Sequence, residues 1–394
     1  MKKFTFLTML ALGVLGGMAQ DFTFNDVLYS VLDADAKTCT TQVGSVTPGN
    51  LAKGPNNEFA GDLVIPEWVT DGQEKYKVVE IGDYSFAEAN ELTSVKLPST
   101  VTYIGKQAFA RCNKLLTVEM ENSVTEIGPS AFSNSYNMTS LKLSEALTEI
   151  PDNMCRACSG LLTIEIPESV TVINEEAFWC CYGMKPTLPS KLEIIGGQAF
   201  VGCEFEELVL PNTVTSIGAF AFQSCRMTTV TVPQSITELS SHIFVECLWT
   251  EEFNLPSTLT KVGDGAFNSC TEVKTMNCYA LTPPECEAGL NDRIYCFSGI
   301  PFETAELHVV TGTRELYAEA EGWKDFQNII DDLEEQPEET PGEDGGDEDA
   351  VESIEADGTA EAVYYNLQGV MVKNPAPGSI LVKKTGNKVV KVRI

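Results

Sequence analysis

Histidine is nearly absent from this sequence. Only His242 and His308 occur among 394 residues. Their spacing from the cysteines does not match a zinc site, and no serine–histidine–aspartate arrangement is suggested. The chain also lacks a glycine-rich loop before a helix, which many phosphate-binding proteins use. We therefore expect no catalytic residue, no metal site and no cofactor.

Positive charge is also scarce. The chain carries 57 acidic and 26 basic residues, for a formal net charge of -31. Nucleic acids are bound mainly through lysine and arginine contacts to phosphate, so this balance excludes a nucleic-acid partner. It also argues against electrostatic attachment to an anionic membrane surface.

Long hydrophobic runs are missing, apart from one near the start. The run from Phe4 to Val14 is shorter than the about 20 residues that a membrane-spanning helix needs. Lys2 and Lys3 precede it, and Gly17-Met18-Ala19 follows it. This order predicts a signal peptide over residues 1–19 and an exported mature chain without a transmembrane span. The residue after the cleavage site is Gln20 and not a cysteine, so we expect no lipid anchor.

What the sequence does contain is a motif that returns. Ile104-Gly105 is followed by Ala108-Phe109 and then by Cys112. The position of Phe109 recurs at steps of 22 or 23 residues, and it is filled in order by Phe86, Phe109, Phe132, Cys155, Phe178, Phe200, Phe222, Phe244 and Phe267. Repetition at such a period is typical of a solenoid, in which each unit packs only against its neighbours.

The residues of one unit predict its structure. Leu92–Leu97 alternates apolar and polar residues, which indicates a strand with one buried face. Pro98 ends this strand, and Val101–Ile104 predicts a second, shorter one. Gly105 marks a bend where a side chain would obstruct. We expect a mainly β repeat solenoid of about nine units, with an interior formed by Phe86, Phe109, Phe132, Phe178, Phe200, Phe222, Phe244, Phe267, Cys112, Cys203 and Cys225.

The run Leu97-Pro98-Ser99-Thr100-Val101-Thr102-Tyr103-Ile104-Gly105, with Ala108-Phe109 and Cys112, resembles the leucine-rich repeats of BspA-like bacterial surface proteins. The resemblance covers about residues 61–330. Three kinds of local departure occur: Cys155 replaces phenylalanine, Pro151 and Asn174 replace glycine, and Ser240–Ile243 replaces the glycine-to-alanine part. The resemblance implies adhesion to host or neighbouring-cell surface proteins. Glycan binding, or a structural surface-layer role without catalysis, is the alternative.

Composition divides the chain further. The run from Asp331 to Asp349 holds eleven acidic residues and no basic one, which predicts a disordered linker. The predicted order is a signal peptide (1–19), an N-terminal cap (20–60), leucine-rich repeats (61–280), a C-terminal cap (281–330), the acidic linker (331–350) and a small β domain (351–394).

The last segment changes in character. From Ala362 to Ile394 there are six basic residues and no acidic one. Val363–Val372, Gly378–Val382 and Lys388–Ile394 read as three strands. The segment resembles a C-terminal sorting domain of the type IX secretion system, which implies the outer surface of a Gram-negative bacterium. Whether the segment is cleaved on export stays open.

Thirteen cysteines in an exported chain normally indicate a disulfide framework. Seven of them instead follow the phenylalanine position by three residues, where Ala89 and Ser135 also occur. We interpret this position as a small interior slot, not a metal or redox site. Cys155 and Cys158 form a C-x-x-C pair, but no helix N-terminus is expected there to stabilise a thiolate. A disulfide between Cys286 and Cys296 is left open.

The outward strand positions form the candidate binding face, because solenoids offer continuous faces to ligands. We select Lys96, Glu119, Lys142, Glu165, Thr229, Thr231, Glu252 and Asn254. The alternative is that threonine is simply favoured on exposed strands and that the charges pair across strands. Trp179, Tyr182 and Trp249 lie near the bends and could anchor a partner instead.

The sequence holds 57 acidic residues, so the number of carboxylates does not rule out the pair that a glycosidase uses. However, Glu126, Glu149 and Glu238 share one repeat position, which favours a solvated edge. We therefore expect that the protein is not an enzyme.

Overall fold

The computed structural model describes residues 21–44, 54–289 and 292–336, and the strands at 363–365, 380–385 and 388–393. The predicted signal peptide and most of the predicted acidic linker lie outside these residues. The chain divides into two units, Met1–Pro337 and Glu338–Ile394, which are described separately.

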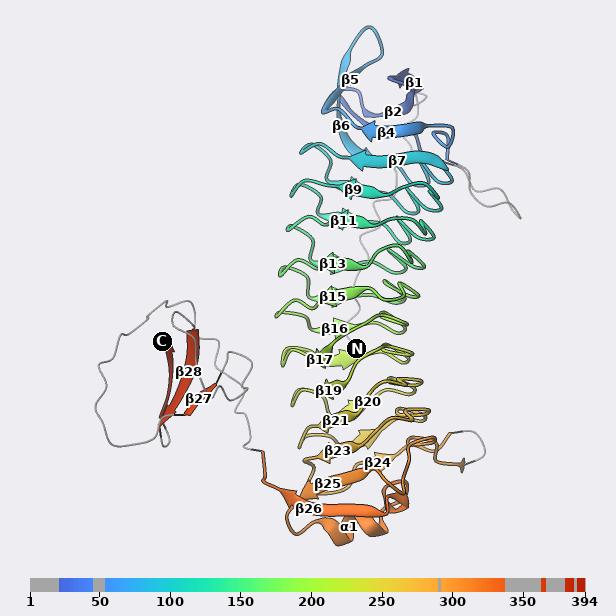
Figure 1. Cartoon of the computed structure of the whole chain (residues 1–394). Helices are drawn as coiled ribbons and strands as arrows, with labels where there is room; N and C mark the ends of the chain where they lie inside the picture. Colours follow the sequence, from blue (N-terminus) through green and yellow to red (C-terminus); the bar gives the residue numbers. More distant parts are fainter. Residues whose placement is uncertain are drawn as a thin grey trace. The chain divides into compact units, whose positions relative to one another are not determined.

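The first unit is a β-solenoid of about 11 turns with almost no helix, which confirms the predicted fold class. Each turn places one strand on a common face (Figure 1). In order, these strands are β4 (Ala60–Val64), β7 (Glu91–Lys96), β9 (Thr117–Glu119), β11 (Ser140–Lys142), β13 (Thr163–Glu165), β15 (Lys185–Thr187), β17 (Glu207–Val209), β19 (Thr229–Thr231), β21 (Glu252–Leu255), β23 (Thr275–Cys278), β25 (Glu306–Val310) and β26 (Asn328–Leu333).

The strands of this face are parallel, and their hydrogen bonding falls into three blocks. The blocks are β4-β7-β9-β11, then β13-β15, then β17 through β26. Strand β15 contains Pro186, which has no N–H for a ladder hydrogen bond. All strands of the face thus run in the same direction, but strand-to-strand hydrogen bonding is missing between β11 and β13 and between β15 and β17.

A second set of short parallel strands carries the residues just before the repeat glycine. These are β6 (Lys75–Ile81), β8 (Tyr103–Ile104), β10 (Glu126–Ile127), β12 (Glu149–Ile150), β14 (Val172–Ile173), β16 (Ile194–Ile195), β18 (Ser216–Ile217), β20 (Glu238–Leu239), β22 (Lys261–Val262) and β24 (Glu285–Cys286). The last residue of each strand is isoleucine, leucine or valine, or cysteine in β24, and it is buried.

The repeat glycine is required by close approach between coils. A Cβ atom on Gly105 would lie 2.5 Å from the backbone nitrogen of Asp83 in the preceding coil. The left-handed backbone positions belong to other residues of the unit, such as Gln107 (φ 50°) and Arg111 (φ 58°), two residues before and after Phe109. Glycine at position 105 thus lets successive coils touch.

Phenylalanine rings fill the interior as a stack along the solenoid. The rings of Phe86 and Phe109 are 5.3 Å apart, and those of Phe109 and Phe132 are 5.8 Å apart. Cys155 interrupts the stack, which resumes where Phe178 meets Phe200 at 5.6 Å. All eight phenylalanines named from the sequence are fully buried.

The cysteine slot has a specific role that small size alone does not explain. The thiol of Cys112 donates to the carbonyl oxygen of Phe86 in the preceding coil at 3.2 Å. Ser135 makes the same contact with the carbonyl of Phe109 at 3.0 Å. Equivalent thiol contacts are made by Cys158, Cys181, Cys203, Cys225, Cys247 and Cys270. The slot therefore favours a small side chain that can also donate a hydrogen bond.

All thirteen cysteines are free and buried. Burial raises the pKa of the Cys112 thiol to about 12. A buried thiol with such a pKa is protonated near neutral pH and is a poor nucleophile, which agrees with a packing role.

The first coil is covered by strands from the N-terminal segment. Strands β1 (Asp21–Phe24), β2 (Val27–Asp33) and β3 (Thr38–Thr41) pair antiparallel in order, and β3 then pairs in parallel with β6. Strand β5 (Trp68–Thr70) pairs antiparallel with β6, so the polar residues 71–74 form the turn of a hairpin.

The sequence pattern suggested that the repeat ends after Cys270, but the array continues beyond it. The ring of Phe297 stacks on that of Phe267 at 5.4 Å, and β25 and β26 extend the parallel sheet. An insertion places Phe297 thirty residues after Phe267, which hides it from a search at 22 or 23 residues. The count of nine units was therefore too low, and β26 runs to Leu333, past the predicted boundary at 330.

The last coil is closed by helix α1 (Arg314–Glu319) and the 3₁₀ turn η2 (Trp323–Asp325). Trp323 is fully buried, and its ring centroid lies 4.7 Å from that of Phe297. Its indole N–H donates to the carbonyl of Pro284 at 2.8 Å.

The described residues of the second unit form three strands, β27 (Val363–Tyr365), β28 (Ile380–Thr385) and β29 (Lys388–Arg393). They form an antiparallel sheet in the order β27-β28-β29.

Candidate functional site

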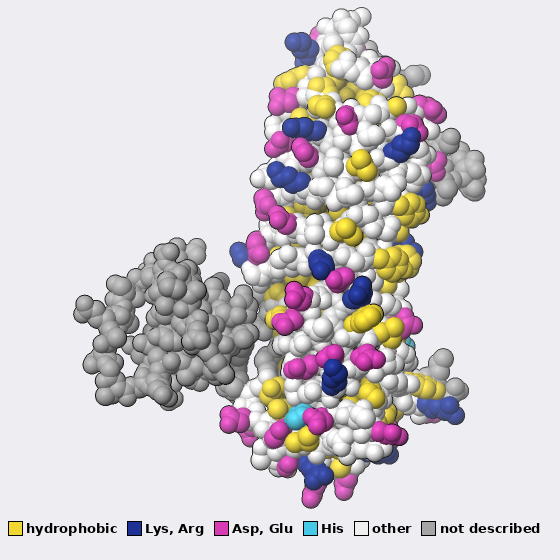
Figure 2. Space-filling model, viewed as in Figure 1, with side chains coloured by type: hydrophobic (Ala, Val, Ile, Leu, Met, Phe, Trp, Pro, Cys, Tyr) yellow, Lys and Arg dark blue, Asp and Glu magenta, His cyan; other side chains and the backbone are white. Residues whose placement is uncertain are grey.

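The outward side chains of strands β4 to β26 form one surface, which we call the strand face. Its predicted columns are in register: Lys96 is opposite Glu119, and Glu119 is opposite Lys142. Farther along, Thr231 is opposite Asn254. The face is seen from the front in Figure 2.

The N-terminal half of the strand face holds the four predicted charged residues Lys96, Glu119, Lys142 and Glu165, and all are exposed. The ammonium of Lys96 lies 3.9 Å from the carboxylate of Glu119. An exposed pair at this distance contributes at most about 1 kcal/mol to stability. Its charges therefore remain open to a partner.

A hollow of about 240 Å³ opens in this half, where β11 is not hydrogen-bonded to β13. Ser140–Leu143 and Glu145 line one side, and Thr163–Glu165 lines the other. Lys142 and Glu165, both selected from the sequence, thus lie on opposite walls of the same hollow. The sequence pattern gave no sign of this break in pairing.

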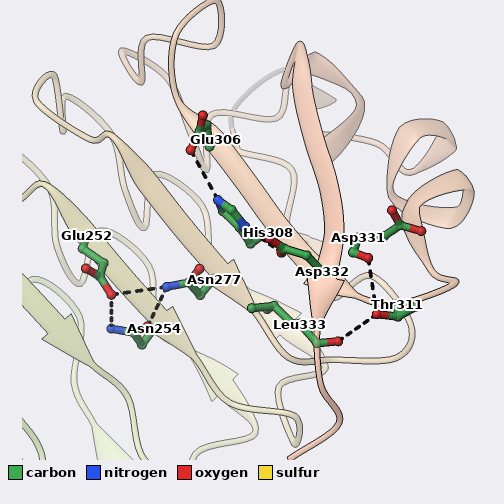
Figure 3. A network of polar contacts seen from close by, with 9 residues as sticks. All are labelled: Glu252, Asn254, Asn277, Glu306, His308, Thr311, Asp331, Asp332 and Leu333. Atoms are coloured by element: carbon green, nitrogen blue, oxygen red, sulfur yellow. Dashed lines mark hydrogen bonds and ion pairs between the residues drawn. The ribbon is translucent and has the colours of Figure 1, made fainter.

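The C-terminal half is more enclosed, and its side chains make more hydrogen bonds with one another. Thr229, Thr231, Glu252 and Asn254 are half-buried there. The carboxylate of Glu252 accepts hydrogen bonds from the amides of Asn254 (3.0 Å) and Asn277 (3.3 Å), and Asn277 also donates to Asn254 at 2.8 Å (Figure 3). These three side chains are held in place before any partner arrives.

The network continues onto the last two strands. His308 on β25 lies in register with Asn277. Its Nδ1 is 2.7 Å from the carboxylate of Asp332 on β26, and its Nε2 is 3.4 Å from that of Glu306 (Figure 3). We call Glu252, Asn254, Asn277, Glu306, His308 and Asp332 the C-terminal polar cluster.

The electrostatic character of this cluster is acidic. Burial, and then the nearby carboxylates of Glu252 and Asp332, raise the pKa of the half-buried Tyr279. The cluster thus presents hydrogen-bond acceptors, and a basic or hydrogen-bond-donating ligand matches it best.

Sequence reasoning found Glu252 and Asn254 but missed Glu306, His308 and Asp332. These three lie on β25 and β26, beyond the insertion that breaks the 22–23-residue period. The alternation in Glu306–Val310 was the available signal, since it matches the outward pattern of the earlier strands.

Other kinds of site find no support in the part of the chain that the structure describes. There, no group of three or more histidine, cysteine, aspartate or glutamate residues could hold a metal ion. Within the same residues, no helix has the length and hydropathy to cross a membrane.

The geometry defines a class: a leucine-rich repeat solenoid with an exposed parallel sheet. The BspA type Leucine rich repeat region matches the chain in six copies, over residues 79–204 and 184–282. These matches span more than half of the sequence, so the chain belongs to the BspA-type leucine-rich repeat family, which is typical of cell surfaces.

Several solved structures are similar to the chain. A leucine-rich repeat protein from Bacteroides ovatus is 18% identical, with 79% of this chain and 88% of that one covered and a TM-score of 0.41. A leucine rich cell surface protein from Faecalibacterium prausnitzii is 21% identical (80% and 100% covered, TM-score 0.34). The pneumococcal vaccine antigen PcpA is 14% identical (81% and 100% covered, TM-score 0.41). No curated protein matches the chain significantly.

Proposed function

We propose that this chain is an exported adhesion protein that binds a protein partner through its strand face, without catalytic activity or a cofactor. The observation that carries this proposal is the alignment of the predicted outward residues on one face that ends in the C-terminal polar cluster. A surface of this kind offers many contacts to an extended partner.

The partner that fits is a surface protein of a host or neighbouring cell with a basic patch. The C-terminal polar cluster brings Glu252, Glu306 and Asp332 together on one surface. The charge of -31 for the whole chain adds a long-range attraction for basic surfaces. Electrostatic complementarity of this kind raises the association rate and selects against acidic partners.

A matched pair of charge reversals tests the strand face. Glu306→Lys places a positive charge in the C-terminal polar cluster, whereas Glu238→Lys makes the same change on β20, in the other set of strands. We expect Glu306→Lys to weaken binding to immobilised extracellular-matrix proteins about tenfold or more, since one close charge pair is worth about 1.5 kcal/mol or more. Glu238→Lys should bind like the wild type. Equal binding by both variants would exclude the cluster as the site.

We further propose export through residues 1–19 and delivery to the outer surface of a Gram-negative cell through residues 351–394. The family, and the antiparallel sheet of β27, β28 and β29, support this proposal. Deletion of residues 351–394 should leave the protein inside the outer membrane, as measured by protease accessibility on intact cells. If the truncated protein still reaches the surface, the sorting role is wrong.

A further inference from the structure

A second surface lies along the edge of the solenoid where the face strands begin. Hydrophobic side chains gather there, on the right-hand edge in Figure 2. Its members have exposed fractions between 47% and 60%, and they are Leu116, Tyr136, Leu162, Tyr182, Leu248 and Trp249. Exposed aromatic and aliphatic side chains that recur along one edge favour an interaction site, and the predicted strand face does not include them.

Trp249 is the best-defined member of this edge. The guanidinium of Arg226, on the preceding coil, lies 5.0 Å from the centre of its ring. Arg226 is in turn 3.8 Å from the carboxylate of Glu204. The indole is therefore positioned by a cation–π contact before binding, which lowers the entropy cost of association.

A hollow of about 360 Å³ lies beside this indole. It is lined by Trp249, Leu248, Glu246, Ser224 and Ser269. One part of the lining is thus aromatic and aliphatic, and the other carries hydroxyl and carboxylate groups.

The polar groups of the hollow make hydrogen bonds with one another and with neutral neighbours. Ser224 donates to the carboxylate of Glu246 at 2.9 Å, and the amide of Gln223 donates to the same oxygen at 3.5 Å. Ser269 donates to the side-chain oxygen of Asn268 at 2.7 Å. Both serine hydrogens are thus used within the protein, so the hollow offers the free lone pairs of Glu246, Ser224 and Ser269 as acceptors beside one aromatic ring.

This combination selects a class of ligand. An anionic ligand is repelled by Glu246. A purely apolar ligand would bury the polar groups of Glu246, Ser224 and Ser269 without replacing their contacts with water. A neutral pyranose suits both parts of the lining, because its C–H face stacks on an aromatic ring while its hydroxyls donate to the free lone pairs of Glu246, Ser224 and Ser269.

We propose that the hollow beside Trp249 is a subsite for a neutral glycan that runs along the solenoid axis. The ring of Tyr182 lies three coils earlier and packs against Gly202, where an added Cβ would be 2.7 Å from the ring. Three coils at a strand spacing of about 4.8 Å amount to roughly 14 Å. A short extended oligosaccharide therefore spans the two aromatic side chains.

Titration of the full-length protein with neutral tetrasaccharides tests this site. The probes are cellotetraose, chitotetraose and mannotetraose, with tryptophan fluorescence and calorimetry as readouts. We expect at least one probe to bind, and Trp249→Ala to weaken that binding at least tenfold. The matched control is Trp68→Ala, because Trp68 is also exposed, at 50%, but lies on the β5–β6 hairpin. This control should bind like the wild type.

A second variant separates recognition from folding. Glu246→Gln keeps the shape of the hollow and should weaken binding at least threefold, with the same melting temperature as the wild type. The proposal is overturned if no tetrasaccharide binds, or if Trp249→Ala binds as tightly as Trp68→Ala. It is also overturned if only an oligo-lysine peptide binds at Trp249, since that result would assign the hollow to basic peptides.

Discussion

At the scale of single residues, the interior is built from two columns with different tasks. Phe200 touches its neighbours in both directions, with ring centroids 5.6 Å from Phe178 and 5.7 Å from Phe222. Cys225, three residues after Phe222, binds the backbone of the coil before it. One column supplies apolar contact, and the other ties each coil to the preceding one.

Phe200→Ala should lower the free energy of unfolding by about 3–5 kcal/mol, because it opens a cavity between two stacked rings. Denaturant unfolding followed by circular dichroism measures this cost. A loss below about 1 kcal/mol would show that Phe200 is not part of a continuous stack.

Cys225→Ser should be tolerated better than Cys225→Ala. The thiol donates to the carbonyl of Phe200 at 3.0 Å, and a serine hydroxyl can keep that contact, as Ser135 does in its own coil. Alanine removes this donor while the carbonyl keeps the N–H of Cys203 at 3.0 Å, so we expect a cost of about 0.5–1.5 kcal/mol. Equal stability of the two variants would mean that the slot selects for size alone.

A count of free thiols tests whether Cys286 and Cys296 form a disulfide, which the sequence left open. Cys286 and Cys296 are both free in the structure, and contact with Cys296 is the main cause that raises the pKa of Cys286. We expect thirteen reactive thiols in the unfolded, non-reduced protein. Eleven would show that these two residues form a disulfide.

At the scale of elements, the two ends of the array differ in how they close. The N-terminal end is covered by the antiparallel strands β1 to β3, and the C-terminal end by α1 and η2. Because each coil contacts only its neighbours, damage at one end should stay near that end.

Trp323→Ala tests this locality. It removes a fully buried ring that packs on Phe297 and Tyr317. We expect amide hydrogen exchange to speed up in β23, β25 and β26, while protection in β7 and β9 stays unchanged. Uniform loss of protection along the whole array would instead indicate a single cooperative unit.

The fold was predictable where the period holds, because strand alternation, the repeat glycine and the phenylalanine column all indicate one unit. The coil that contains Phe297 was not predicted, because an insertion makes it longer than the 22–23-residue period used to find the other coils. The hollow between β11 and β13 was not predictable from the sequence pattern, because it lies where these two neighbouring strands are not hydrogen-bonded to each other. The role of Cys112 was only half visible, because its acceptor lies 26 residues away.

At the scale of the whole molecule, two proposed surfaces with opposite physical character lie on one array. The strand face ends in a cluster of several carboxylates, whereas the hollow at Trp249 combines an aromatic ring with hydroxyl groups and the single carboxylate of Glu246. Net charge should therefore govern one interaction and leave the other largely unaffected.

The salt dependence of binding distinguishes the two surfaces in a single protein sample. Screening shortens the Debye length from about 10 Å at 0.1 M salt to about 3 Å at 1 M. Association of a basic protein partner with the strand face should slow by about tenfold or more over this range, because long-range attraction drives the encounter. Binding of a neutral tetrasaccharide beside Trp249 should change by less than about twofold, because stacking and short hydrogen bonds involve no net charge on the ligand. Surface plasmon resonance measures both.

A protein association rate that does not depend on salt would contradict the electrostatic role of the C-terminal polar cluster. A steep salt dependence of sugar binding would contradict a neutral glycan subsite.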